Sequence, residues 1–341
     1  MHAPGEFHCR SSFDLVGPEA EILINLLLEM AQDKTTNRFS SFLNFFRGNP
    51  PALIGGSILL IMVLSCICAP VFTDFHPQKR VGRPHQPPSE RHWLGTTRSG
   101  RDIFAQSLYG GRISLSVAFG SGFIAMVIAV SLGMSAGYFG GKIDEWINFF
   151  TNVVLVFPQV PLLIVLAAFL GQVGPPIIAL LIGLTAWPWG TRVIRAQTMA
   201  LRYKEFVLAA EVMGEKKWRI ILIEILPNLV SIVGGGFIGV VLYALLSQAG
   251  LEFLGLGDPS SVTWGTMLYW AQNNSSLYTG AWWDVFTPAF IIAIFGGALS
   301  LINISIDQIS NPKLKTGPHL KLWKKLFEKS EKERGALGRN L

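Results

Sequence analysis

Residues 146–191 read WINFFTNVVLVFPQVPLLIVLAAFLGQVGPPIIALLIGLTAWPWGT and contain no Asp, Glu, Lys or Arg. A helix needs about 20 apolar residues to span a bilayer, so this stretch is too long for a single span. It therefore has to turn, and the Gly- and Pro-rich segment at 171–176 favours a hairpin there. The prediction is two membrane spans, of about 146–170 and 175–195.

Four more stretches lack charged residues, at 51–68, 113–141, 225–250 and 285–306. Helices in the core of a soluble protein are shorter and keep a polar stripe, so these repeated runs argue against a soluble enzyme. The chain is also only 15% charged, where about 25% is usual for soluble domains. We therefore expect an all-α polytopic membrane protein of six spans, the other four at about 51–72, 113–137, 227–250 and 286–308.

The distribution of Lys and Arg predicts the orientation, because cytoplasmic loops carry the excess of basic residues. With six spans, both tails lie on the same side of the membrane. That side also holds the seven basic residues of 192–219 and the nine of 309–341, whereas the loop at 251–284, on the opposite side, has no Lys or Arg. Both tails are therefore expected to be cytoplasmic. The seven basic residues between spans one and two disagree with this assignment, which makes the first span its weakest part.

These patterns divide the chain into three parts. Residues 1–50 are expected to form a cytoplasmic extension, because the apolar segment at 22–28 is too short for a signal peptide. Residues 51–308 form the transmembrane domain, with external loops at 73–112 and 251–285 and a cytoplasmic connection at 196–226. Residues 309–341 form a basic cytoplasmic tail.

The sequence also limits the function. Secondary transporters commonly carry ionisable residues at mid-membrane, and the predicted spans have none. No Gly-x-x-x-x-Gly-Lys-Ser/Thr loop, Ser-His-Asp set, paired carboxylates at membrane depth or metal-ligand spacing is present, so no catalytic or metal-binding residue is predicted. The net charge is +6, and the basic residues lie between and beyond the apolar runs. This distribution does not suggest a protein that binds nucleic acid. A stand-alone channel or secondary transporter remains the alternative to an ATP-driven system that uses a separate ATPase.

The connection at 196–226 has features of a docking surface for such an ATPase. A helix is expected from about Glu205 to Gly214, where glycine favours a left-handed cap, and a second amphipathic stretch from Lys216 should stop before Pro227. Ala209 and Ala210 are small enough for a partner to approach closely. An ordinary pair of interfacial helices is the alternative.

This connection resembles the EAA loop of ABC importer permeases, through Ala209-Ala210, Gly214 and the segment ILPN at 225–228. Leu208 stands where the family often has Glu, and Glu224 where many members have His. In the family the loop forms a coupling helix that docks on the ATPase. The resemblance implies that the coupling residues are Glu205, Ala209, Ala210, Glu211, Gly214 and Pro227.

Three further segments resemble dipeptide, oligopeptide and nickel permeases: LGTTRSGRDI at 94–103 with GGRISL at 110–115, FLGLG at 253–257 with WGTML at 264–268, and NPKL at 311–314. Thr97 replaces the usual Asp of the first segment. The residues carried over from the first segment are Gly95, Thr96, Gly100, Arg101, Asp102, Gly111 and Arg112. Those carried over from the loop between spans five and six are Leu254, Gly255, Gly257, Trp264 and Gly265.

The resemblance implies a multi-pass subunit in the inner, or cytoplasmic, membrane. It would be the second, C-type permease of a type I ABC importer, embedded in the lipid bilayer and without a cofactor of its own. Its implied partners are a second homologous permease, two cytoplasmic ATPase subunits that bind ATP and Mg, and an extracytoplasmic solute-binding protein. The cargo remains open among peptides, nickel complexes, oligosaccharides and peptide antibiotics.

The predicted external loop at 251–285 is rich in aromatic residues, with Trp264, Tyr269, Trp270, Tyr278, Trp282 and Trp283. Such residues form belts at membrane interfaces. They would equally suit a surface that meets the binding protein, and the basic residues of 79–112 would suit an acidic partner. Both interpretations remain open for each loop.

Overall fold

The computed structural model describes residues 49–310, with side chains up to residue 306. The chain divides into two units, Met1–Pro50 and Pro51–Leu341. Most of the predicted N-terminal extension, the NPKL segment and the tail therefore lie outside the described residues. Within 49–310 the structure is helical, and its extended pairings are limited to isolated bridges between Thr96 and Asp102 and between Val173 and Gly257.

Five helices of the described region are long and apolar enough to cross a membrane, and a bent pair brings the number to six if it counts as one span. The polytopic all-helical fold is thus confirmed, while the sixth span depends on that bent pair. The elements are α3 (Pro50–Ile67), α4 (Ala69–Phe72), α5 (Ile103–Phe139), α6 (Gly141–Val156), α7 (Gln159–Leu170), α8 (Pro175–Arg202), α9 (Glu205–Val212), α10 (Lys217–Arg219), the π-helix η2 (Ile220–Ile225), α11 (Leu226–Phe253), α12 (Trp264–Asn273) and α13 (Trp283–Ser310).

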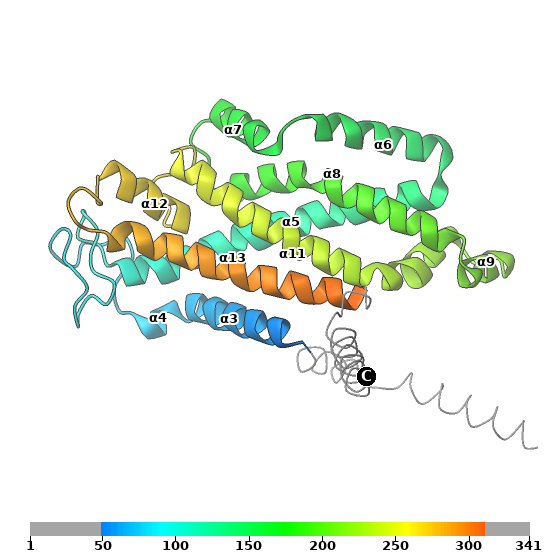
Figure 1. The fold of residues 1–341 in the computed structure, drawn as a ribbon. Coiled ribbons are helices and arrows are strands. Elements are labelled where there is room, and N and C mark those ends of the chain that lie inside the picture. The colour runs from blue at the N-terminus through cyan, green and yellow to red at the C-terminus, as the bar shows by residue number, and fades with distance from the viewer. Residues whose placement is uncertain (1–48, 311–341) are drawn as a thin grey trace, which may run out of the picture. The chain divides into compact units, whose positions relative to one another are not determined.

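α5 and α8 lie side by side (Figure 1), and their contact is close because glycines of α5 face α8. A Cβ atom on Gly133 would lie 2.9 Å from the carbonyl oxygen of Thr191, and one on Gly137 would lie 2.7 Å from that of Arg195. These glycines form a Gly-x-x-x-Gly pattern, which lets membrane helices approach to backbone contact. The contact fixes α5 and α8 as the centre of the bundle.

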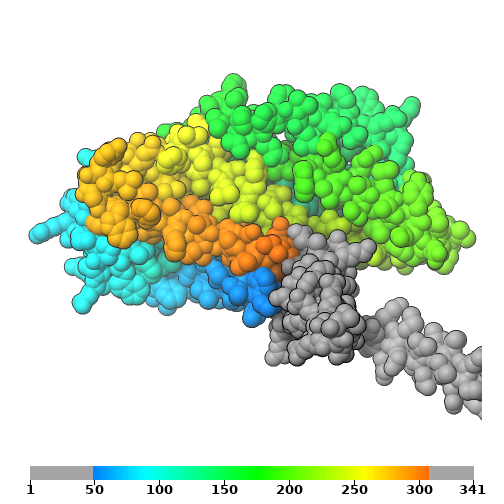
Figure 2. Space-filling model, viewed as in Figure 1, coloured from blue at the N-terminus to red at the C-terminus, as the bar shows by residue number. Residues whose placement is uncertain are grey.

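Helices α11, α12 and α13 also pack against α5. Phe295 and Leu299 of α13, Leu245 of α11 and Trp264 of α12 share one hydrophobic cluster with α5. α3 lies along α13, where a Cβ on Gly55 would be 2.6 Å from the carbonyl oxygen of Ala298 (Figure 2). Many large apolar side chains of α3, α6 and α7 remain exposed, as suits surfaces covered by lipid or by other membrane subunits.

The stretch predicted as one span at 146–170 consists of two helices. α6 and α7 meet at an angle of 81°, with the break at Phe157 and Pro158. Proline has no N–H to donate, and it forces the preceding residue out of the helical region. Phe157 accordingly has φ −79° and ψ 129°, which is extended backbone. The hydropathy of this stretch is uniform, so only the proline could have indicated the bend.

Other helix boundaries also differ from the predicted spans. α5 begins ten residues earlier than the predicted start at 113, because the Asp102 side chain accepts a hydrogen bond from the N–H of Ala105 at 2.8 Å and caps the helix. The predicted first span at 51–72 is interrupted at Cys68, and α8 continues to Arg202 through the first part of the predicted cytoplasmic connection. Polar and charged residues hid the start of α5 and the end of α8 from a hydropathy pattern, whereas the break at Cys68 goes with Pro70 in the first turn of α4.

Candidate functional site

The predicted coupling residues lie around α9, at the end of the bundle where α5 passes into α6 (Figure 1). Gly214 has a φ of 77°, the left-handed conformation expected for it. Its N–H donates to the carbonyl of Glu211 at 3.0 Å, and the N–H of Glu215 donates to that of Ala210 at 3.1 Å. These two bonds define a Schellman motif, which ends α9 sharply and turns the chain toward α10.

α9 has one buried face and one exposed face. Val207 and Ala210 are buried in a cluster that includes Tyr138 of α5 and Ile221 of η2. The other coupling residues implied by the sequence, Glu205, Ala209, Glu211, Gly214 and Pro227, are exposed. The two alanines therefore differ, since Ala209 faces outward and Ala210 packs inside. Four large apolar side chains of this region are also exposed: Phe206, Leu208, Val212 and Met213, the last two at 89% and 75%.

Polar contacts connect α9 and its neighbours to the membrane helices. The Tyr138 hydroxyl donates to Oε1 of Glu211 at 2.8 Å, and the Arg202 guanidinium lies 5.7 Å from the Tyr138 ring centroid. Nearby, Arg195 of α8 forms a bidentate pair with Asp144 at the start of α6, with Nη2 2.6 Å from Oδ2. These contacts fix the position of α9 relative to α5 and of α6 relative to α8.

Removing the Tyr138 hydroxyl should loosen α9 without a loss of packing. Tyr138→Phe keeps the ring but removes a hydrogen bond to the Glu211 carboxylate. Because Glu211 is exposed, we expect the free energy of opening α9 to fall by about 1 kcal/mol, which is less than for a buried hydrogen bond to a charged group. Amide exchange in α9 should therefore become roughly fivefold faster, by the relation between local opening energy and exchange. Tyr203→Phe, at a highly exposed hydroxyl, is the control. Equal exchange in the two variants would contradict the positioning role of Tyr138.

The segment after Gly214 was expected to stop before Pro227, and instead it continues into α11 without a break. α10 passes into η2, where the N–H of Leu226 bonds to the carbonyl of Ile221, five residues back. Pro227 is the second residue of α11 and follows η2 directly, so it lies inside a continuous helix, where the wider π turn accommodates its missing N–H. The proline changes the type of helix at this point and does not end it, so α10, η2 and α11 form one span from Lys217 to Phe253.

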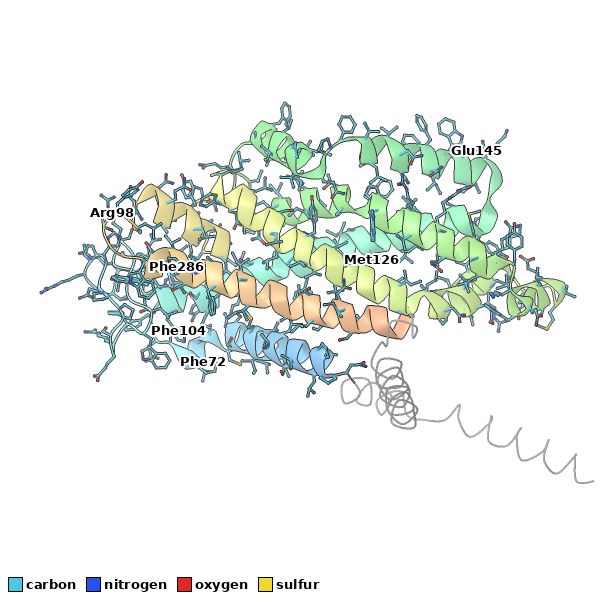
Figure 3. All side chains as sticks on the ribbon, viewed as in Figure 1. Phe72, Arg98, Phe104, Met126, Glu145 and Phe286 are labelled. Atoms are coloured by element: carbon cyan, nitrogen blue, oxygen red, sulfur yellow. The ribbon has the colours of Figure 1, made fainter. Side chains whose placement is uncertain are left out.

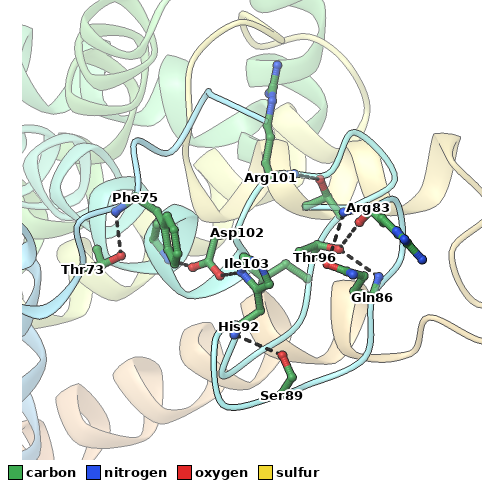
Figure 4. A network of polar contacts seen from close by, with 12 residues as sticks. Thr73, Phe75, Arg83, Gln86, Ser89, His92, Thr96, Arg101, Asp102 and Ile103 are labelled. Atoms are coloured by element: carbon green, nitrogen blue, oxygen red, sulfur yellow. Dashed lines mark hydrogen bonds and ion pairs between the residues drawn. The ribbon is translucent and has the colours of Figure 1, made fainter. Parts of the chain in front are cut away.

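Most of the first external signature forms the loop between α4 and α5, at the other end of the bundle (Figure 4). Oδ1 of Asp102 accepts from Nδ1 of His92 at 2.8 Å. The buried Thr96 hydroxyl donates to the carbonyl of Arg83 at 2.7 Å and accepts from the N–H of Gln86 at 2.9 Å. Gly95 and Gly100 have φ of 78° and 70°, which supply the turns of the loop. These signature residues build the loop itself.

The signature residues on α5 hold the other helices in place. Nε of Arg112 donates to the carbonyl of Cys66 at 2.6 Å and Nη2 donates to that of Ile67, so this side chain binds the free carbonyls at the end of α3. Gly111 leaves room for Trp264, whose ring would be 2.9 Å from a Cβ there. Arg101 differs from the rest, because its side chain points away from the loop's network (Figure 4).

The signature between α11 and α12 is largely internal. Trp264 is 1% exposed, and its Nε1 donates to the carbonyl of Ser107 at 2.9 Å. The surface of aromatic residues expected from the sequence therefore does not include it, although Tyr278 and Trp282 are exposed. The glycines of this signature fit tightly: Gly255 against the Tyr269 ring, and Gly257 and Gly265 against Glu252, while Leu254 is exposed.

Glu252 is a structural centre that the sequence interpretation missed. It is 2% exposed, and it accepts hydrogen bonds from Nε2 of Gln248 at 2.9 Å and from the hydroxyl of Thr263. It thereby connects the end of α11 to the N-cap of α12. A Glu just after a predicted span could have been noticed, but its partner Thr263 lies in a loop whose path the sequence does not indicate.

A cavity of about 540 Å³ lies among α8, α11 and their neighbours, with Met126 of α5 on its wall (Figure 3). No charged side chain lines it among the described residues, and its polar groups are neutral: Gln159, Gln197, Ser231, Tyr243 and Asn303. Such a lining can hydrogen-bond a solute without fixing an ion. Within residues 49–306, no group of three His, Cys, Asp or Glu side chains could hold a metal ion.

Comparisons with known proteins place these features in a family. The model for the binding-protein-dependent transport system inner membrane component matches residues 129–316, and that for the N-terminal TM domain of oligopeptide transport permease C matches 38–88. The dipeptide transport system permease protein DppC of Bacillus subtilis (strain 168) is 33% identical over 271 residues, covering 78% of this chain and 83% of that protein. The oligopeptide transport system permease protein OppC of the same organism is 30% identical over 272 residues, covering 79% and 88%.

Among solved structures, the MetNI methionine ABC transporter in an inward-facing conformation is 18% identical in sequence, with a TM-score of 0.48. The match covers 61% of this chain and 95% of that chain.

Proposed function

The chain belongs to the family of binding-protein-dependent transport system inner membrane components, and we propose that it imports peptides or similar small solutes. It is a transmembrane permease of an ATP-driven importer and a transport subunit, not an enzyme. The names of its relatives specify dipeptides and oligopeptides, which makes peptides the first cargo to test.

We propose that α9 is the part of the chain that binds a separate ATPase. The observation that carries this proposal is the exposed apolar group formed by Phe206, Leu208, Val212 and Met213, on a helix fixed to α5 through Glu211. Several large apolar side chains exposed on one well-anchored helix are typical of a protein contact. ATP and Mg would then bind to two such ATPase subunits, and this chain would carry no cofactor.

Movement of α9 would reach the solute pathway through a short route. α9 packs on η2, η2 continues into α11, and α11 lines the cavity of about 540 Å³ through Gly235, Gly236 and Gly239. Because buried Val207 and Ala210 connect α9 to η2, closure of the ATPases would displace the start of α11. A second homologous permease would complete the pathway on the open side of this cavity.

The orientation follows from the same proposal. If α9 meets an ATPase, its end of the bundle is cytoplasmic, and α12 and the loop between α4 and α5 face outside. The bent α6–α7 pair would then form the sixth span, both tails would be cytoplasmic, and the chain would reside in the inner, or cytoplasmic, membrane. A solute-binding protein would deliver cargo to the external end.

The proposal is tested by reconstitution of the chain with the subunits that co-purify with it from its own membrane. Proteoliposomes should accumulate a labelled dipeptide or tripeptide only when ATP and the binding protein are both present. A variant ATPase that binds but does not hydrolyse ATP is the matched control and should reduce uptake to background. Equal uptake without ATP would contradict the proposal and would support a channel or secondary transporter.

A further inference from the structure

The two external signature segments enclose a cavity of about 720 Å³, within the range of small-molecule sites, about 300–1,000 Å³. One wall comes from the loop between α4 and α5, and the other from residues 258–274. Nε2 of Gln78 donates to the carbonyl of Ser260 at 2.9 Å, and Nη1 of Arg98 donates to that of Asn274 at 3.4 Å. These bonds hold the two walls together independently of any occupant.

Arg101 supplies a positive charge to this cavity. Its N–H donates to the Thr97 hydroxyl at 3.2 Å and its carbonyl accepts from the N–H of Thr97 at 2.9 Å, so its backbone is fixed. Its guanidinium, by contrast, makes no hydrogen bond or ion pair with the residues that the structure describes. A guanidinium carries five donors in a planar arrangement that matches a carboxylate, so the cavity contains an unused anion-binding group.

Asp258 supplies a fixed negative charge on the opposite wall. The N–H and the hydroxyl of Ser260 both donate to its carboxylate, at 2.9 and 2.7 Å from Oδ1. A carboxylate accepts about four hydrogen bonds, so this one retains capacity for a cation. A second carboxylate lines the cavity from the start of α13, but Asp284 is 3% exposed and bound by the Ser276 hydroxyl, which makes it a poorer partner. The remaining polar groups include the neutral amides of Gln172 and Asn274.

We propose that this cavity is an external subsite for a short peptide with free termini. Arg101 would bind the terminal carboxylate, Asp258 the terminal ammonium, and the amides of Gln172 and Asn274 the peptide backbone. Opposite charges on two fixed walls, separated by neutral hydrogen-bonding groups, match a zwitterion better than a metal complex or a neutral sugar. This inference rests on the proposed import of peptides and assigns a recognition step to the permease itself.

The test compares a tripeptide with its C-terminally amidated form, chosen so that the binding protein holds both. In the complete reconstituted importer, Arg101→Gln should lower the uptake rate of the free tripeptide about tenfold, the effect of losing a hydrogen-bonded ion pair. Uptake of the amidated form should change less than twofold, which also shows that the variant folds. Glu90→Gln, which removes an exposed charge from the same loop outside this cavity and outside its basic residues, should leave both rates unchanged.

Each other result has a distinct meaning. If Arg101→Gln lowers both rates equally, Arg101 serves contact with the binding protein, and the subsite is wrong. If neither rate changes, the cavity does not bind the carboxylate, and the subsite is wrong while peptide import stands. If the wild-type importer takes up neither peptide with ATP, the proposed peptide import itself fails, and the subsite fails with it.

Discussion

Leucine in place of Gly133 is expected to prevent stable assembly of the helix bundle. The added Cβ would lie 2.9 Å from the Thr191 carbonyl oxygen and 2.9 Å from Cβ of Ile194, and neither is the free end of a flexible side chain. α5 and α8 would have to separate along their contact, at a cost of about 1–3 kcal/mol for an overpacked core and more for a larger side chain. Most of the variant protein should then aggregate when it is extracted in detergent, as size-exclusion chromatography would show.

The same helix contains a matched control. A Cβ on Gly120 would meet nothing within 4 Å, so Gly120→Leu adds the same side chain to α5 without a clash. Gly137→Leu should behave like Gly133→Leu, because its Cβ would lie 2.7 Å from the Arg195 carbonyl oxygen. If Gly133→Leu and Gly120→Leu give equal yields and equal thermal midpoints, backbone contact between α5 and α8 does not support the fold.

The sequence was informative about the membrane helices because the bilayer requires long charge-free runs. It could not indicate how those runs end or bend. The capping of α5 by Asp102 and the 81° bend at Pro158 depend on single residues, and hydropathy does not register either. The Gly-x-x-x-Gly contact of α5 was also unrecognised, because the partner backbone belongs to a helix that lies far away in sequence.

Those features of the candidate site that depend only on local backbone conformation could be predicted from the sequence. The left-handed Gly214 follows from a glycine at a helix end, since that conformation is local. Side-chain roles were less accessible. Nothing in the sequence distinguishes the buried Ala210 from the exposed Ala209, or pairs Tyr138 with Glu211, because both depend on where α9 packs. The resemblance to known permeases indicated which loops carry the signature residues. It did not indicate that Thr96 and Asp102 mainly stabilise the loop that contains them.

Valine in place of Gly214 is expected to abolish ATP-driven uptake while the helix bundle remains folded. A β-branched residue is a strong outlier at the φ of 77° found here, and left-handed backbone costs an ordinary L-residue about 1–2 kcal/mol. The Schellman bonds of Glu215 and Gly214 would be lost, and the turn between α9 and α10 would take another path. Uptake by the reconstituted importer should fall to background, although ATPase subunits measured alone keep their basal rate.

This effect would act through the backbone, since a Cβ at Gly214 meets nothing within 4 Å. Backbone strain therefore predicts a ranking of substitutions that steric bulk does not. Asparagine tolerates left-handed backbone, so Gly214→Asn should retain most of the uptake even though its side chain is as long as that of leucine. Gly214→Ala, which is smaller but strained, should fall below Gly214→Asn. If uptake instead follows side-chain size, with alanine above asparagine, then Gly214 contributes an open surface for the ATPase and its helix cap has no part in coupling.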